Sequence, residues 1–247
     1  MPEMIQLRTD DGVCPTHVFR PPTGDNLPAI IMFMDGFGIR PAMFELADRL
    51  ANGGYCVALP DLYYRSGWTA EDAKGLFEIQ EKREFWYANI LPTVSGANIM
   101  RDMPMLLSYL HSRSDVRDGA VGTTGYCLGG RLSITAAGTY PDDIAAAASY
   151  HGGGLATDAP DSPHRLAPQM KARVYVGGAI EDRGFDDEQK QRLDDALTAA
   201  NVDHTVETYR ARHGWVMSDL PVYDKSATER HWQTTFALFG QTFGVAH

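Results

Sequence analysis

The stretch GYCLGG at residues 125–130 decides the fold of this chain, because it places a cysteine between glycines at an expected strand-to-helix turn. In a Gly-x-nucleophile-x-Gly turn the backbone bends so sharply that only residues without a side chain fit beside the reactive residue. The pattern before it, residues 120–124, is that of a short buried strand, and residues 128–140 have the pattern of a helix rich in small residues. The turn therefore predicts a nucleophile elbow with Cys127 as a thiol nucleophile.

Two other interpretations of this turn stay open. A cysteine between glycines is often a small buried hydrophobic residue without any chemistry. A glycine-rich turn before a helix can also bind phosphate through its backbone N–H groups. The lysine of a P-loop and the glycine spacing of a dinucleotide-binding turn are both missing, so the phosphate-binding interpretation is the weaker of the two.

Length and charge restrict the class of protein. With 247 residues, 44% of them hydrophobic, the chain can bury one substantial core, and we expect a single domain over residues 1–247. A formal net charge of -10 argues against nucleic acid or an anionic membrane surface as a partner, because both require clustered Lys and Arg. The composition favours an enzyme that acts on a small molecule, as a monomer or homodimer.

The N-terminus and the cysteines point to the cytoplasm. Residues 1–4 have no basic region followed by an apolar one, and eighteen apolar residues never run together. The three cysteines cannot all pair, and they lack the Cys-x-x-Cys spacing of a zinc site. We therefore expect a cytoplasmic protein that uses no metal and no cofactor.

Strand patterns alternate with helix patterns along the chain. Residues 29–34 are continuously apolar, as in a strand covered on both faces, and residues 41–53 show helical spacing with Pro41 suited to the first turn. The expected strands are residues 4–8, 13–19, 29–34, 55–59, 120–124, 144–150, 172–176 and 205–209. This alternation predicts an α/β fold, with a mostly parallel central sheet, helices on both faces and active-site groups at the carboxyl ends of the strands.

Three expected helical regions have unusual sequence features. Residues 66–97 fit the alternation least, and they predict either a lid or substrate wall or a pair of solvated surface helices. Pro104 predicts that the next helix starts close to it, because proline is tolerated only in the first turn of a helix. The C-terminal helix has an expected buried stripe of four aromatic residues, Trp232, Phe236, Phe239 and Phe243.

A cysteine nucleophile needs a base, because the pKa of a free thiol is about 8.5 and most of it is protonated at neutral pH. In α/β-hydrolase chains the order along the sequence is nucleophile, acid and then histidine. His213 is the best candidate, since it directly follows the last expected strand, whereas His204 precedes that strand. The other late histidines are His164, His231 and His247.

The acid should follow the strand at residues 172–176. Asp182 is the first choice, with Glu181 as its direct competitor, while Asp186 or Asp187 suits the start of the next helix. Asp182 would accept a hydrogen bond from the Nδ1–H group of the histidine and stabilise the imidazolium.

Backbone donors complete the predicted site. The N–H groups of Leu128, directly after the nucleophile, and of Gly36, after the strand at residues 29–34, are the expected oxyanion donors. Each such donor typically lowers a barrier by about 3 kcal/mol.

The assembled motifs resemble the dienelactone hydrolase family of the α/β-hydrolase fold over nearly the whole chain. The resemblance rests on FMDGFG at residues 33–38, LPDLY at 59–63, GYCLGG at 125–130, Asp182 and RHG at 212–214. It implies that Cys127, Asp182 and His213 form the triad. Family members also carry a glutamate after the third strand that contacts the thiol and helps to deprotonate it. The matching residue here is the shorter Asp35, which could instead only bind nearby loop amides.

The resemblance also concerns the substrate. Family members that act on dienelactone hold its carboxylate partly with an arginine four residues after the histidine, and this chain has Met217 there. Arg83 or Lys82 could supply a cation from the opposite side. Residues 150–153 resemble the family loop that borders the substrate pocket, so we name Tyr150, His151 and Trp215 as further candidate substrate contacts. His151 could equally be a residue that ends a strand near the surface.

The resulting hypothesis is cleavage of a small activated ester or lactone through a thioester acyl-enzyme, with no metal or cofactor. An acyltransferase would use the same triad and pass the acyl group to an alcohol or thiol. A non-catalytic ligand-binding member of the fold is the third possibility, and the ordered triad argues against it.

Overall fold

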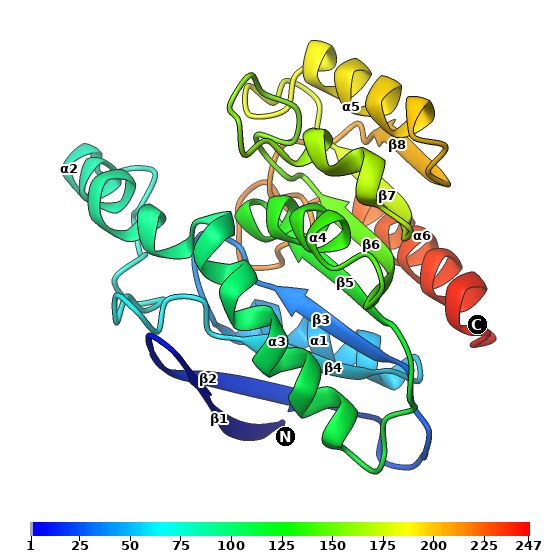
Figure 1. Cartoon of the computed structure of the whole chain (residues 1–247). Coiled ribbons are helices and arrows are strands. Elements are labelled where there is room, and N and C mark those ends of the chain that lie inside the picture. Colours follow the sequence, from blue (N-terminus) through cyan, green and yellow to red (C-terminus); the bar gives the residue numbers. More distant parts are fainter. Residues whose placement is uncertain (1) are drawn as a thin grey trace.

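An eight-stranded sheet forms the centre of the computed structural model, which describes residues 2–247 (Figure 1). The order across the sheet is β1-β2-β4-β3-β5-β6-β7-β8. The β1–β2 and β2–β4 pairs are antiparallel, and every other neighbouring pair is parallel. The strands are β1 (Glu3–Thr9), β2 (Gly12–Phe19), β3 (Ala29–Phe33), β4 (Cys56–Pro60), β5 (Val121–Tyr126), β6 (Ile144–Tyr150), β7 (Arg173–Gly178) and β8 (His204–Thr208).

Helices cover both faces of this sheet. Figure 1 shows α3, α4 and α5 on one face and α1 and α6 on the other. The helices are α1 (Pro41–Asn52), α2 (Gln80–Phe85), η1 (Trp86–Ile90), η2 (Leu91–Val94), α3 (Gly96–Ser112), α4 (Leu128–Thr139), η3 (Pro163–Gln169), α5 (Asp187–Ala199) and α6 (Lys225–Phe243). The predicted α/β fold with a mostly parallel sheet is confirmed.

Burial explains why the central strands are apolar at every position. All five residues of β3 and all five of β4 are buried, since helices pack on both sides of them. A strand buried on both faces cannot alternate polar and apolar residues. On the outer face, Trp232, Phe239 and Phe243 of α6 are buried as expected, whereas Phe236 is only partly buried.

The prediction that a helix starts close to Pro104 is wrong, because α3 begins at Gly96 and Pro104 lies inside it. A proline in a helix interior leaves the carbonyl four residues earlier without its helical donor. Here that carbonyl belongs to Met100, and it accepts a hydrogen bond from the Tyr140 hydroxyl instead. A distant tyrosine thus satisfies the group that the proline leaves free.

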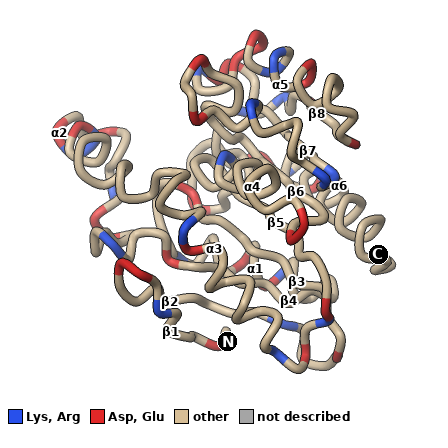
Figure 2. The backbone as a smooth tube through the Cα atoms, viewed as in Figure 1, with Lys and Arg blue, Asp and Glu red and all other residues tan. Residues whose placement is uncertain are grey.

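Charged side chains of both signs are mixed over the surface. Figure 2 shows acidic and basic residues close together on α2 and on α5. No helix within residues 2–247 has the length and apolar character that crossing a bilayer requires.

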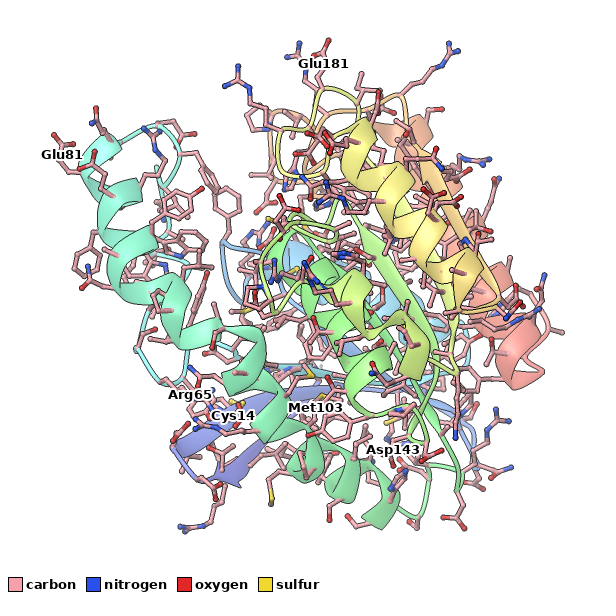
Figure 3. The ribbon with its side chains drawn as sticks, turned by 45° about the horizontal axis from the view of Figure 1, so that its top comes forward. Cys14, Arg65, Glu81, Met103, Asp143 and Glu181 are labelled. Atoms are coloured by element: carbon pink, nitrogen blue, oxygen red, sulfur yellow. The ribbon has the colours of Figure 1, made fainter. Side chains whose placement is uncertain are left out.

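Residues 66–97 include the part of the chain that projects furthest from the sheet. α2 extends away from the body, and Glu81 lies at its outer end (Figures 1 and 3). The segment is anchored by five buried side chains, those of Ala73, Leu76, Trp86, Ile90 and Val94. It also exposes four large hydrophobic side chains, Phe77, Ile79, Phe85 and Tyr87. A lid function for this segment stays a prediction.

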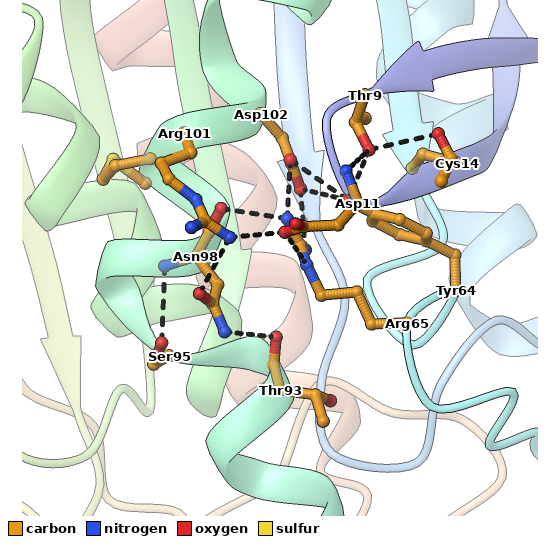
Figure 4. A network of polar contacts seen from close by, with 12 residues as sticks. Thr9, Asp11, Cys14, Tyr64, Arg65, Thr93, Ser95, Asn98, Arg101 and Asp102 are labelled. Carbon is orange, nitrogen blue, oxygen red and sulfur yellow. Dashed lines mark hydrogen bonds and ion pairs between the residues drawn. The ribbon is translucent and has the colours of Figure 1, made fainter.

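A buried ion pair fastens α3 to the loop after β4 (Figure 4). The Arg65 guanidinium donates two hydrogen bonds to the Asp102 carboxylate, at 2.7 and 2.9 Å, and both side chains are only 9% exposed. Arg65 also donates to Asp11 in the β1–β2 turn, and the Tyr64 hydroxyl donates to Asp102. The network therefore joins three segments that are far apart in the sequence.

We predict that Asp102→Asn destabilises the fold by about 3 kcal/mol, because it removes the charge that compensates a buried guanidinium. Urea unfolding followed by circular dichroism measures the change. Asp142→Asn is the matched control, since Asp142 pairs with Lys171 on the exposed surface and an exposed pair contributes little. Equal stability losses in the two variants would contradict the importance of the buried pair.

Candidate active site

The turn between β5 and α4 has the geometry of a nucleophile elbow. Cys127 lies in it with φ 55° and ψ -118°, a backbone conformation that side-chain-bearing residues rarely adopt. A Cβ on Gly125 would lie 2.0 Å from the carbonyl oxygen of Gly129, and a Cβ on Gly129 would lie 2.3 Å from that of Phe33. Both glycines are therefore required for steric reasons, as the sequence motif predicts.

Cys127 differs from the other two thiols in its surroundings. It is partly exposed at the N-terminus of α4, where the helix dipole favours a negative charge. Cys14 and Cys56 are buried, and burial raises their pKa values to about 12 and about 11. Those two thiols stay protonated at neutral pH, which leaves Cys127 as the candidate nucleophile.

His213 and Asp182 meet at the same end of the sheet. The loop after β7 carries Asp182 and the loop after β8 carries His213, and His213 Nδ1 lies 2.7 Å from Asp182 Oδ2. The second carboxylate oxygen of Asp182 accepts the N–H of Gly184 at 2.9 Å. Burial opposes ionisation of Asp182, but these contacts hold its pKa below the ordinary value.

The charge of His213 is coupled to that of Cys127. Burial works against protonation of this imidazole, yet the negative charge and hydrogen bonds of Cys127 and Asp182 raise its pKa to about 11. The imidazole is therefore bonded at Nδ1 to the Asp182 carboxylate, and its pKa also depends on the sulfur of Cys127. A proton held there can be passed to a leaving group.

The competing acids and histidines lie elsewhere. Glu181 faces Arg212 at the surface, and Asp186 caps the N-terminus of α5. His231 is fully buried against the Tyr126 hydroxyl, and burial lowers its pKa to about 3. Within residues 2–247, no group of three His, Cys, Asp or Glu side chains is arranged to hold a metal ion.

The two expected oxyanion donors are neighbours. A Cβ built on Gly36 would lie 3.8 Å from Leu128 Cδ2, so the loop after β3 passes beside the start of α4. In the described part of the chain, neither the N–H of Gly36 nor that of Leu128 donates to another protein group. Both are therefore available to a negatively charged oxygen near Cys127.

Asp35 lies in this loop but binds an arginine. Its carboxylate accepts two hydrogen bonds from Arg40, at 2.6 and 2.9 Å, and one from the N–H of Phe37 at 3.0 Å. Burial raises the pKa of Asp35, and Arg40 opposes that shift. The guanidinium also donates to Asp219 in the loop after His213. Sequence reasoning missed Arg40, since nothing in the spacing indicates a pair with the distant Asp219.

The candidate substrate residues are placed less favourably. Tyr150 and Trp215 are fully buried, the former bonded to Thr235 and the latter stacked on Tyr209. His151 is also buried, and its ring centre lies 4.9 Å from that of His213. Their contact with substrate stays a prediction, and all three side chains are buried.

Arg83 and Lys82 of the projecting segment are the candidate cations for a substrate carboxylate. Arg83 donates to the carbonyl of Phe77, and Lys82 donates to that of Lys74. Met217 has no exposed surface. Neither basic side chain is joined to the catalytic groups, so their role in substrate binding also stays a prediction.

Comparisons of the sequence and of the structure with known proteins point to the same family. The model of the dienelactone hydrolase family matches residues 15–243. A protein of Methylorubrum extorquens, provisionally named carboxymethylenebutenolidase, is 28% identical over 98% of this chain and 81% of its own length. Carboxymethylenebutenolidase 1 of Cupriavidus pinatubonensis is 26% identical over 84% of this chain and 83% of its own. A crystal structure of a provisionally named dienelactone hydrolase from Klebsiella pneumoniae superimposes with a TM-score of 0.85, at 23% identity and 98% coverage of both chains.

We predict that the titration of His213 depends on the sulfur of Cys127. In the wild type the imidazole should titrate at a pKa of about 11, and in Cys127→Ser this pKa should fall, because the charge of the sulfur is lost. NMR titration of the histidine ring signals measures both values, and the signals of His111, a surface histidine, serve as the internal control. The same His213 pKa in both proteins would contradict the coupling.

Proposed function

Because the chain belongs to the dienelactone hydrolase family, we propose that it hydrolyses small activated esters or lactones with a Cys127, His213 and Asp182 triad. The observation that carries the proposal is the 2.7 Å contact between His213 Nδ1 and Asp182 Oδ2, on an imidazole whose charge is coupled to Cys127. An acid that orients a histidine beside a nucleophile is the arrangement used for acyl transfer on several unrelated folds. The relatives named carboxymethylenebutenolidase support a lactone as one candidate substrate.

In the first half of the reaction, the thiolate of Cys127 attacks the carbonyl carbon. A C–S bond forms, and the π electrons of the carbonyl move to its oxygen. The resulting oxyanion is stabilised by the N–H groups of Gly36 and Leu128. When the C–O bond breaks, the leaving oxygen takes the proton of His213, and a thioester remains on the enzyme.

In the second half, the neutral His213 takes a proton from water while the water oxygen attacks the thioester carbon. The intermediate collapses, the C–S bond breaks, and the acid leaves with the thiolate restored. An amide would react poorly, because a thiolate leaves more readily than an amine and the first intermediate would return to substrate. The proposal therefore favours enol esters, lactones and other activated acyl groups.

The surroundings of the site favour an uncharged substrate. Met217 occupies the position where the family's dienelactone-cleaving members have an arginine, and it is buried. The nearest described cation of the Gly36 loop, Arg40, already serves two carboxylates, Asp35 and Asp219. A substrate carboxylate that bound Arg40 would have to displace one of them, so we expect neutral esters to rank above carboxylated lactones.

We predict that the wild type hydrolyses 4-nitrophenyl esters and that Cys127→Ala lowers kcat to about a thousandth or less, because the nucleophile is lost. Release of 4-nitrophenolate measures the rate, and a carboxylated dienelactone is compared with neutral lactones in the same panel. Cys14→Ala is the matched control, since Cys14 is a buried thiol on β2 outside the proposed machinery. It should retain wild-type turnover.

Other outcomes of that panel would redirect the proposal. Product that forms only after an alcohol or thiol acceptor is added would indicate an acyltransferase. A folded wild type with no turnover of any kind would contradict the hydrolase and favour ligand binding. Residual turnover in Cys127→Ala equal to that of the wild type would overturn the role of the thiol.

The predicted help of Asp35 in deprotonating the thiol has its own test. Asp35→Asn should move the pH profile of enzyme acylation to higher pH, because the variant lacks a carboxylate that can take a proton. Asp219→Asn is the control, since it removes the other partner of Arg40 and leaves Asp35 in place. If only the size of the rate changes and the profile stays at the same pH, Asp35 does not take part in proton transfer.

A further inference from the structure

The peptide group between Gly36 and Phe37 is held from both sides. Its carbonyl oxygen accepts the Tyr63 hydroxyl at 2.8 Å, and its N–H donates to Asp35 Oδ1 at 3.0 Å. Because a peptide group is planar, two bonds at its opposite ends fix its orientation. The N–H of Gly36 lies in the preceding peptide group, whose carbonyl oxygen, that of Asp35, accepts the N–H of Gly38 at 3.2 Å. The two peptide groups meet at the Cα of Gly36, and glycine has the widest choice of backbone conformations, so the N–H of Gly36 keeps one direction only while both groups are held.

Trp86 extends this contact into the projecting segment. Its indole N–H donates to the Tyr63 hydroxyl oxygen at 3.1 Å, which leaves the Tyr63 proton for the carbonyl of Gly36. The indole also lies against the glycine, since a Cβ on Gly36 would be 3.5 Å from Trp86 Cζ2. Both aromatic side chains are buried, Tyr63 at 1% and Trp86 at 5% exposure. The pair forms a dry relay from residue 86 to the loop after β3.

The local backbone supports a special role for Trp86. It begins η1, a π-helix that directly follows α2. Such short π-helical turns are rare in proteins, and many of those that occur lie at functional sites. Its neighbours Phe85 and Tyr87 are 50% and 54% exposed. The turn thus directs one aromatic side chain inward to Gly36 and leaves the adjacent two in solvent.

We propose that Tyr63 and Trp86 are positioning residues that hold the oxyanion donor of Gly36 in its productive orientation. The inference rests on the proposed function, because it assigns Gly36 to the oxyanion hole. Loss of one oxyanion donor typically lowers kcat by a factor of about 100 to 1,000. A donor that is present but no longer held should cost less, about tenfold, and should leave KM nearly unchanged because the ground-state carbonyl needs no such alignment.

The test is a double-mutant cycle of Tyr63→Phe and Trp86→Phe, with hydrolysis of 4-nitrophenyl acetate as the readout. Tyr63→Phe removes both bonds of the relay and should lower kcat about tenfold, with KM within about twofold. Trp86→Phe removes only the outer bond and should have a smaller effect, about threefold, which disappears when Tyr63 is already Phe. Tyr87→Phe is the matched control, since it removes an exposed hydroxyl beside Trp86 and should retain wild-type kinetics.

Acylation of Cys127 by the same ester, followed by mass spectrometry of the intact protein, distinguishes failure of the relay from failure of the proposed function. A wild type that is acylated while Cys127→Ala is not, combined with an unchanged kcat in Tyr63→Phe, overturns the relay alone. Effects of the two substitutions that multiply in the double variant also overturn it. A wild type that neither carries the acyl group nor releases 4-nitrophenolate overturns the proposed function and the relay with it. If Tyr63→Phe does not fold, Trp86→Phe decides, and a wild-type kcat in that folded variant overturns the role of Trp86.

Discussion

The candidate active site depends on one backbone bend, that of Cys127 between Gly125 and Gly129. The bend is possible only because the backbone of β3 and the first turn of α4 approach each other where a side chain would otherwise lie, with a Cβ on Gly129 2.4 Å from the carbonyl oxygen of Met34. The same close approach brings the loop after β3 beside Leu128. The positions of the proposed nucleophile and of its two expected backbone donors thus follow from a single packing requirement, which is why the glycines matter as much as the cysteine.

The parallel sheet explains why the sequence could indicate the other two members of the proposed triad. Parallel neighbours end at the same edge, so the loops after β5, β7 and β8 must meet there. Only a few acids and histidines lie in those loops, and chain order reduces them further. The choice of Asp182 over Glu181 was less certain from sequence, because it depends on backbone angles: Glu181 has φ 53° and faces Arg212 instead of His213.

What the sequence did not reveal consists of contacts between distant segments. Pro104 lies inside α3 because Tyr140, on another element, satisfies the carbonyl that it leaves free. Arg40 joins Asp35 to Asp219 across more than half of the chain. Local patterns report periodicity and turn chemistry, and they contain no signal for a partner that tertiary packing supplies. For the same reason the sequence of residues 66–97 contains no signal for the contact between Trp86 and Gly36.

The position of Trp86 has a consequence for how such a site can change. If the projecting segment only shaped the substrate pocket, its sequence could vary without affecting the chemical step. Through Tyr63, however, Trp86 is bonded to the peptide that follows Gly36, so under the proposed function substitutions of Trp86 that alter a substrate wall would also disturb the proposed oxyanion donor. Variation is then tolerated best at the exposed positions of α2, such as Phe85, while Trp86 stays fixed. Under this proposal, substrate selection and rate would be coupled at this one side chain, and the burial that excludes water from its hydrogen bonds would strengthen the coupling.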